Sequence, residues 1–534
     1  MNRTIYFKKI ISRISGLLGL LDRNPSSDTY GCFDRDYWHY TVIDFACARK
    51  QEAVLTLALL YGLKYKSNPY YNNAKILNWV NAALKFWAKI QCKDGSFNEW
   101  YPNEHSFVAT AFSSYAISET LLLLKDKIKH KEKIIPCLKK AADWLLNKNE
   151  KRVLNQESGA AIALLNIYLL TKNKKYKYAA EKKIIFMLKN QNSEGWWSEY
   201  GGPDIGYLSL TIDYLAKYYK KTKDKNILKA LEKAVEFTGY FIHPNLSSGG
   251  EYASRNTEYL IPHGLEILAK KNKAAAAIAE HMRESLKSDS AVFPLSIDDR
   301  YLSYIAYTWL QAFIDAKPLA KTTPKYKQNF VKYFSKSNIY INSNPCFYLI
   351  VNFNKGGSFK LFFKKTNKLI CDSGIFVQTK KDKLISGYLS KNNKIKIHKN
   401  KLYVEGAMAK IPSKNLLNPM KNTALRAFQC SFGKSNRISY LFKNKLRDTL
   451  ITKTKKTNVI FKREMRITNT GIKIIDIVKN LKKIKKIMAG EKCSYIYTPS
   501  SRYFHISDLA NKPTYLINPR IVKKIIKIHR IYNN

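Results

Sequence analysis

The chain has 534 residues, of which 45% are hydrophobic and 13% aromatic, and its formal net charge is +53. This composition excludes an intrinsically disordered protein, and the length requires more than one hydrophobic core. The charge alone suggests a nucleic-acid-binding protein, but the lysines are spread evenly and the sequence contains no nucleic-acid-binding motif.

The positive charge is consistent with two further origins. Lys, Asn, Ile and Tyr are all abundant and share A/T-rich codons, so compositional drift is the first. A polyanionic substrate is the second. The eight cysteines are far apart and form no Cys-x-x-Cys pair, so the sequence indicates neither a zinc site nor a disulfide framework. We expect no cofactor, no metal and no specific nucleic-acid partner.

Residues 1–23 are basic and apolar at helical spacing, which predicts a first helix. They have no uninterrupted apolar core and no small-residue cleavage site, so they do not resemble a secretory signal peptide. No apolar run reaches the ~18 residues that cross a bilayer. We therefore expect no transmembrane segment and a cytoplasmic location, with a periplasmic or surface-associated location as the alternative.

The spacing of apolar residues along the sequence changes after about residue 320. Before it, apolar residues recur at helical spacing, as in "YLSLTIDYLAKYY". After residue 345, short alternating runs such as "CFYLIVNF" and "MRITNTGIKIIDIV" are separated by turn residues, which predicts antiparallel strands. We predict a helical domain over residues 1–320, a linker over 321–345 and a β domain over 346–534.

Two stretches of the helical half share one pattern, "QCKDGSFNEWYP" and "QNSEGWWSEYGGP". Gln, Gly and Glu recur at equal offsets: Gln91/Gln191, Gly95/Gly195 and Glu99/Glu199. Looser relatives surround Gly31, Gly159 and Gly249. Such spacing predicts helix hairpins that stack into a closed ring, with their loops on one face. The loops would then gather Asp34, Asp36, Glu99, His105, Glu199, Tyr207 and Glu251 around one cleft. Alternatively, the glycines only form turns and the acids only cap helices.

In "YPNEHSF", Asn103 and His105 stand at the start of an apolar helix. The positive end of the helix dipole disfavours an imidazolium there, so we expect a neutral imidazole. A neutral imidazole beside an amide can bind a carboxylate. Alternatively, Asn103 is a helix cap and His105 is structural.

The stretch "GWWSEYGGPDIGYLSL" places Trp197, Tyr200 and Tyr207 around a Gly-Gly-Pro turn. Trp197 could stack on a sugar face, although adjacent tryptophans commonly pack in a core. A tyrosine at a helix start can act as a base or an acid if a cationic neighbour lowers its pKa. The alternative is that both tyrosines pack.

Two more segments are rich in polar and aromatic residues. "GGEYASRNTEYLIPHG" contains Glu251, Tyr252, Arg255, Asn256 and His263. Its arginine could bind the carboxylate of an acidic sugar with two hydrogen bonds. In "GCFDRDYWHY", Asp34 and Asp36 are either hydrolytic carboxylates or parts of an ion-paired loop.

A helical toroid followed by an antiparallel β-sandwich resembles the heparinase II/III-like polysaccharide lyases, which include alginate-lyase-like enzymes. "NEHSFVATAF" resembles the family's Asn-His segment, and "EGWWSEYGGPDIGYLSL" resembles its segment with the catalytic tyrosine. The resemblance covers most of the chain in architecture, and it is closest to a branch associated with surface polysaccharides. It implies an enzyme, a carbon–oxygen lyase, that cleaves a uronic-acid-containing polysaccharide by β-elimination.

The resemblance also implies roles for residues of this chain. The catalytic candidates are Asn103, His105, Tyr207 and His263. The substrate-binding candidates are Arg255, Asn256, Tyr200, Glu99, Glu251, Tyr252, Trp197 and Asp36. The family also takes a histidine from the β domain, for which His398 is the candidate. The expected partner is an acidic polysaccharide or oligosaccharide.

Two alternative functions stay open. A glycoside hydrolase on the same toroid would need a pair of Asp or Glu residues facing the cleft. A glycan-binding protein of a surface-polysaccharide pathway would keep the cleft without the chemistry.

Overall fold

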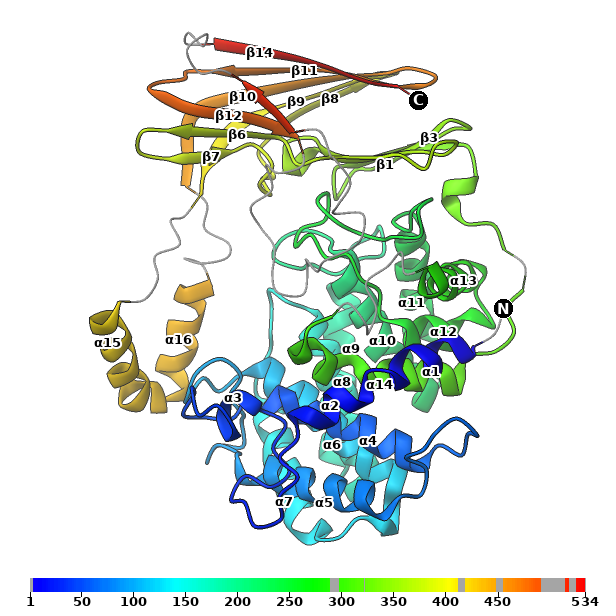
Figure 1. The fold of residues 1–534 in the computed structure, drawn as a ribbon, viewed down its shortest axis with the longest axis vertical. Coiled ribbons are helices and arrows are strands. Elements are labelled where there is room, and N and C mark those ends of the chain that lie inside the picture. The colour runs from blue at the N-terminus through cyan, green and yellow to red at the C-terminus, as the bar shows by residue number, and fades with distance from the viewer. Residues whose placement is uncertain are drawn as a thin grey trace.

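The computed structural model describes residues 3–288, 297–320, 322–411, 418–447, 455–490, 514–517 and 525–533. The N-terminal half is a ring of helices, and the C-terminal half is a two-layered β domain that lies across one face of the ring (Figure 1). An α/α toroid followed by an antiparallel β-sandwich is therefore confirmed.

The helices of the ring form two concentric layers. Among the described residues, the inner layer consists of α4 (Ala53–Gly62), α6 (Phe107–Leu124), α8 (Asn155–Thr171), α10 (Ile205–Thr222), α12 (Pro262–Ala269) and α14 (Asp299–Asp315). The outer layer consists of α1 (Thr4–Ile11), α2 (Ile14–Leu20), α5 (Ala74–Lys89), α7 (Lys131–Leu146), α9 (Lys174–Lys189), α11 (Lys225–Gly239) and α13 (Lys273–Ser288), and the short α3 (Arg35–Trp38) follows α2. Each inner helix packs against the next, and α14 packs against α4, so the ring is closed.

The inner helices are surrounded by protein, which explains their composition. Helix α6 is buried at nearly every position, and a helix that is apolar all round belongs in a core. Within the described residues, one helical stretch, Phe107–Lys127, is long and apolar enough to cross a membrane, and 78% of its apolar window is buried inside the protein. Its hydropathy is thus that of an inner ring helix.

Gln91 and Gln191 hold the two repeated turns in the same way. Each Nε2 donates a hydrogen bond to the carbonyl of the glycine four residues later, over 3.0 Å in both turns. Each also donates to a carbonyl of the next outer helix, over 2.8 Å in both cases. Gly95 and Gly195 have φ angles of +92° and +105°, which favour glycine. The repeated sequence is therefore a repeated tie between a turn and a helix.

The three looser relatives of this pattern divide into two kinds. Gly31 lies in a turn and Gly249 in a loop, with φ angles of +92° and +66°. Gly159 does not form a turn, because it lies inside α8, where a Cβ atom would meet the ring of Phe112 at 2.3 Å. This glycine lets α8 approach α6 closely.

The described residues of the β domain form two antiparallel sheets. The five-stranded sheet has the order β1 (Phe330–Phe334), β2 (Ile339–Ser343), β3 (Phe347–Asn352), β4 (Ser358–Phe363) and β5 (Leu369–Asp372). The nine-stranded sheet has the order β13 (Thr514–Ile517), β12 (Ile484–Gly490), β6 (Ile375–Thr379), β7 (Lys383–Ile385), β9 (Lys401–Lys410), β10 (Lys455–Ile467), β11 (Gly471–Lys479) and β14 (Ile525–Asn533), with β8 (Lys394–His398) also paired to β9. The strands begin at Phe330, inside the segment for which the sequence predicts a linker.

The five-stranded sheet lies between the helical ring and the nine-stranded sheet (Figure 1). In β3, Tyr348 and Ile350 belong to the core of the ring. Phe347, Leu349 and Val351 alternate with them and belong to the core between the sheets. Because side chains alternate along a strand, both faces of the central strands β3 and β4 are buried, and β3 is a nearly continuous apolar run.

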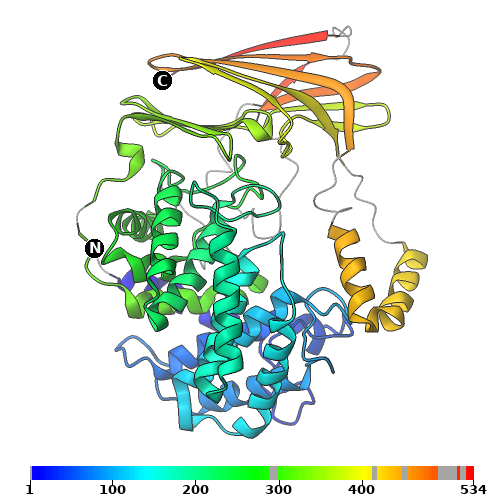
Figure 2. The ribbon, with the colours of Figure 1, turned by 180° about the vertical axis from the view of Figure 1, so that it is seen from behind.

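A helical hairpin interrupts the nine-stranded sheet. It consists of α15 (Pro419–Cys430) and α16 (Asn436–Arg447), lies between β9 and β10 in sequence, and sits beside the ring (Figure 2). The sequence pattern predicts only strands here, so the hairpin is an unexpected element of the β half.

Replacing Gly195 by alanine should destabilise the ring. The new Cβ would lie 2.3 Å from the backbone oxygen of Lys233, at a φ of +105°. We expect the free energy of unfolding to fall by about 2–4 kcal/mol and the thermal unfolding midpoint to fall by several degrees. Gly19→Ala is the matched control, because nothing lies within 4 Å of its Cβ position. Equal midpoints for the two variants would contradict this role of the turn.

Candidate functional site

The connections that lead into the inner helices lie on one face of the ring. Each outer helix ends where the following inner helix begins, so these connections emerge on the same side. Backbone hydrogen bonds join neighbouring connections, from Ala48 N to Asn98 O over 3.0 Å and from Tyr200 N to Arg152 O over 3.1 Å. The β domain lies over this side (Figure 2). We refer to it as the loop face.

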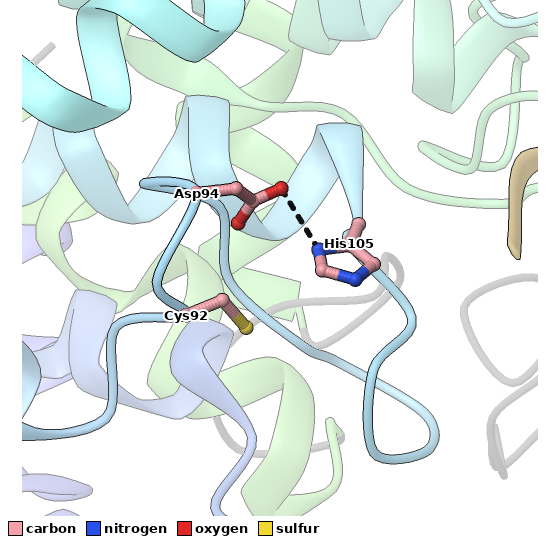
Figure 3. Close-up of side chains that lie close together, drawn as sticks. All are labelled: Cys92, Asp94 and His105. Atoms are coloured by element: carbon pink, nitrogen blue, oxygen red, sulfur yellow. Dashed lines mark ion pairs between the residues drawn. The ribbon is translucent and has the colours of Figure 1, made fainter. Parts of the chain in front are cut away.

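His105 is fixed on the loop face by its own connection. Its backbone has a φ of +49°, and Asn98 Oδ1 accepts hydrogen bonds from the backbone N–H groups of Glu104 and His105, over 2.8 and 3.2 Å. Its Nδ1 lies 2.8 Å from Ser96 Oγ and 3.0 Å from Asp94 Oδ2 (Figure 3). A left-handed backbone at a non-glycine residue is sparsely populated, and such residues cluster at functional sites.

The carboxylate of Asp94 orients the imidazole. Burial alone would raise the pKa of Asp94, but hydrogen bonds from His105, Ser96 and Asn436 outweigh burial and hold it well below its usual value. The carboxylate is therefore ionised and accepts from Nδ1 of His105. Nε2 of His105 is buried and has no hydrogen-bond partner among the described residues.

A pocket of about 200 Å³ adjoins this pair. It is lined by Glu104, His105, Phe107, Trp144, Asn147, Lys148, Asn149 and Glu150 from the ring, and by Asn436, Tyr440, Lys443 and Asn444 from α16. We refer to it as the His105 pocket. The hairpin completes its wall, because Lys443 Nζ bonds Glu104 Oε1 over 2.6 Å and Asn436 Nδ2 bonds Asp94 Oδ2 over 2.6 Å. The sequence pattern did not single out Asp94 or any of the four α16 residues.

One set of side chains in the described residues could hold a metal ion, namely Cys92, Asp94 and His105 (Figure 3). Their donor atoms lie within 4.8 Å of one another. Burial, and then the charge of Asp94, raises the pKa of the Cys92 thiol to about 11. The protonated thiol is a weak ligand, and Asp94 and His105 already bond each other, so these side chains fit a hydrogen-bonded pair better than a metal site.

Tyr207 stands in the first turn of α10, on the same face. Its backbone N–H donates to Asp204 Oδ1 over 3.2 Å, and this carboxylate caps the helix. Nearby, the guanidinium of Arg255 lies 4.7 Å from the ring centre of Tyr200, and Arg255 N donates to Asp204 Oδ2 over 3.0 Å. Asp204 thus fixes Tyr207 and Arg255 together, two of the residues that the sequence singles out.

Glu199 is the buried acid of this group. Burial raises its pKa well above the usual value, and the charge of Asp204 adds to the rise. Asn155 Nδ2 donates to Glu199 Oε2 over 2.8 Å. The environment of Glu199, between the start of α8 and the connection into α10, therefore favours the protonated carboxyl more than water does.

His105 and Tyr207 stand at the same level of the ring. Inside the ring, Phe112 of α6 and Tyr214 of α10 are in contact, with ring centres 4.8 Å apart. Tyr207 precedes Tyr214 by about two helical turns, and His105 precedes Phe112 by a similar stretch. Both residues therefore stand at the loop ends of helices whose interior side chains meet.

Asn103 and Glu99 make contacts that the sequence does not predict. Asn103 Nδ2 donates to the backbone oxygen of Gln429 in α15 over 3.0 Å, so its amide holds the hairpin. Glu99 lies 3.8 Å from Arg49 and 3.9 Å from Arg300, and burial raises its pKa despite these cations.

Two predicted binding residues lie under the β domain. Asn256 Oδ1 accepts a hydrogen bond from Lys355, which also donates to Ala253 O over 2.8 Å. Burial lowers the pKa of Lys355 to about 8. Glu251 lies 3.3 Å from the ammonium of Lys360 in β4. The geometry gives Asn256 and Glu251 a part in joining the ring to the five-stranded sheet.

Trp197 and Tyr252 are packed inside the ring. Both are buried, and Trp197 Nε1 donates to Met187 O over 2.8 Å. Tyr252 Oη lies 2.8 Å from Nε2 of His243. The position of Trp197 favours the core packing that the sequence left open for it, and Tyr252 lies in the core as well.

His263 and Asp36 are not among the residues that line the His105 pocket. His263 is buried, with Nε2 2.6 Å from Asp315 at the far end of α14, and burial lowers its pKa in spite of that carboxylate. Asp36 is half exposed and pairs with Lys50 over 2.9 Å, as expected of an ion-paired loop. His398 is exposed at the end of β8.

No known protein family and no curated protein matches this sequence. The fold is similar to that of a xanthan lyase from Paenibacillus, with a TM-score of 0.54 and 11% identity over 91% of this chain and 46% of that chain. It is also similar to a chondroitin AC lyase from Streptomyces coelicolor, with a TM-score of 0.56 and 9% identity over 91% of this chain and 67% of that chain.

Heparinase III aligns over 90% of this chain and 78% of that chain, with a TM-score of 0.45 and 12% identity. The chain spans less than half the length of the xanthan lyase, of which it covers 46%. Its similarity to the xanthan and chondroitin AC lyases shows that it has the toroid-plus-sandwich fold of polysaccharide lyases, as its sequence predicts.

Replacing Lys443 by methionine should destabilise the protein at pH 7. Glu104 is almost fully buried, and burial would raise its pKa, but Lys443 and the backbone N–H groups of Trp100 and Glu99 outweigh burial and lower it. Loss of the ammonium leaves the buried carboxylate of Glu104 without its cation. We therefore expect the free energy of unfolding, measured in urea, to fall by about 2–4 kcal/mol.

The pH dependence follows from the lowered pKa of Glu104. The pair stabilises the fold above the usual pKa of a glutamate, and this contribution is lost as pH falls through the lowered value. The difference between Lys443→Met and wild type should therefore shrink toward pH 4. Adding Glu104→Gln should restore most of the lost free energy of unfolding. Lys434 is an exposed lysine just before α16, so Lys434→Met should change the free energy of unfolding little. A Lys443→Met variant as stable as Lys434→Met would contradict this role of the pair.

Proposed function

We propose that this chain is a polysaccharide lyase that cleaves a uronic-acid-containing polysaccharide by β-elimination. The observation that carries the proposal is His105, whose Nδ1 is held by Asp94 and Ser96 while Nε2 has no partner among the described residues. The fold and the net charge of +53 support it, since a basic protein gathers a polyanion. The chondroitin AC lyase of similar fold was solved in complex with chondroitin sulphate.

β-Elimination needs a base for the C5 proton, a cation near the C6 carboxylate and an acid for the leaving oxygen. We assign the base to His105, because an Nδ1–H group donated to Asp94 leaves the lone pair on Nε2. Arg255 binds the carboxylate and stabilises the enolate. The electrons of the C5–H bond form the C4–C5 double bond, the C4–O bond breaks, and Tyr207 gives its proton to the leaving oxygen.

The carboxylates of the loop face support hydrolysis less well. Glu199 has the raised pKa of a general acid, but the carboxylate coupled to it, Asp204, is bound by Thr257 and by the backbone N–H groups of Arg255 and Tyr207. A carboxylate that is bound in this way is poorly placed to activate a water molecule. His105 and Tyr207 therefore fit elimination better than Glu199 and Asp204 fit hydrolysis.

The test is incubation with alginate, xanthan and chondroitin sulphate, with detection of the ultraviolet absorbance of the unsaturated product. Wild type should generate this signal on at least one polymer. His105→Asn and Tyr207→Phe should each lower kcat by about a hundredfold or more, because each removes a proton-transfer group. His130→Asn is the matched control, since His130 is an exposed histidine that stands directly before α7, and its rate should stay unchanged.

Thermal midpoints of the variants separate lost chemistry from lost folding. Release of reducing ends without the absorbance of the unsaturated product would indicate a hydrolase instead of a lyase. Retention of a polymer without any cleavage would indicate the glycan-binding alternative. Full activity of His105→Asn would remove His105 from the mechanism.

A further inference from the structure

A second hollow opens beside the His105 pocket, on the outer side of α9. It has a volume of about 720 Å³. Helix α9 forms one side, and the end of α7 together with the segment that follows α7 forms the other. We refer to it as the α9 groove. Asn149 lines both the groove and the His105 pocket, so the two hollows meet at this residue.

The groove is basic. Four of its lining residues are lysines, and none of its lining residues is a carboxylate. Lys175 pairs with Asp143 over 2.8 Å, outside the lining, but Lys182 and Lys189 are exposed and have no ion pair or hydrogen bond among the described residues. Two ammonium groups thus remain available to an anionic ligand.

The floor of the groove is apolar and partly aromatic. Tyr178 is 58% exposed and Ile185 is 53% exposed, although both side chains are large and hydrophobic. Tyr178, Lys182, Ile185 and Lys189 recur at helical spacing, so they follow one side of α9 over about 16 Å. An exposed tyrosine can stack on the apolar face of a sugar while a lysine nearby binds its carboxylate.

The segment between the two hollows is held firmly. Lys183, which is buried, donates to the backbone oxygen of Lys148 and to Asn149 Oδ1, the latter over 2.8 Å. It also pairs with Glu157 at the start of α8 over 2.9 Å. The shared wall at Asn149 therefore keeps one position relative to α8 and α9, as a binding surface for an extended ligand requires.

We propose that the α9 groove is an accessory binding site for the acidic polysaccharide. A polymer that enters the His105 pocket passes over Asn149 and lies along α9, with its carboxylates on Lys182 and Lys189 and one sugar face on Tyr178. This inference rests on the proposed function for the identity of the polymer, and it adds that the chain binds long substrates at a distance from the chemistry.

The test is affinity electrophoresis of the full chain through gels that contain alginate or chondroitin sulphate. All variants carry Tyr207→Phe, so that the polymer is not consumed. Lys182→Glu/Lys189→Glu should raise the dissociation constant about tenfold, because two attractive contacts become repulsive. Tyr178→Ala should also weaken retention. The control is Lys229→Glu/Lys233→Glu on α11, which makes the same charge change on another outer helix and should have a much smaller effect.

The outcomes separate this inference from the proposed activity. Equal retention of the α9 and α11 variants overturns the groove, whether or not unsaturated product forms. Groove-dependent retention without any unsaturated product supports the groove and overturns the lyase. Tighter groove-dependent binding of single-stranded DNA than of either polysaccharide overturns the assignment to a polysaccharide. In active protein, the groove variant should raise KM for the polymer and leave KM for a tetrasaccharide unchanged.

Discussion

Closure of the inner ring, where α14 packs against α4, is the constraint on which the rest of this structure depends. A closed ring leaves the inner helices no solvent-facing side, which explains why α6 is apolar all round. Its centre is filled by tyrosines, and the hydroxyls of Tyr214 and Tyr307 lie 3.1 Å apart. Because outer and inner helices alternate, the described connections into the inner helices lie on the same face. Residues far apart in sequence, such as His105 and Tyr207, thereby come to stand on one rim.

The C-terminal half turns this rim into a walled site. One face of the five-stranded sheet packs on the ring, and Lys355 reaches from it to the connection around Asn256. The α15–α16 hairpin leaves the other sheet and sets Lys443 and Asn436 against the connection of His105. The candidate chemistry thus depends on both halves, although His105, Tyr207 and Arg255 all come from the ring.

The fold could be predicted from the sequence because its signals are local and repeated. The offset between Gln91 and Gln191 marks equivalent turns, and alternation after residue 345 marks strands. The pattern does not distinguish Gly159 from a glycine in a turn, although Gly159 permits two helices to pack closely. The hairpin was missed although Asn418 caps α15 and Pro419 stands in its first turn, because alternating runs on both sides of it dominate the sequence pattern.

Three of the site residues proposed from the sequence, His105, Tyr207 and Arg255, lie on the loop face. Nothing in the spacing of Asp94 and His105 shows that they touch. Their contact depends on a glycine turn and on left-handed backbone at Asn103 and His105. The sequence does not distinguish Trp197 and Tyr252 from core residues, because an aromatic side chain has the same sequence signature whether it packs or binds a sugar.

The central claim is that this rim performs elimination rather than hydrolysis. The most direct measurement is the mass of the fragments released from a uronate polysaccharide, compared with the same fragments made by acid hydrolysis. Elimination adds no water, so we predict new non-reducing ends that are one water lighter than the hydrolytic ones. Fragments with the full hydrolytic mass would contradict the claim.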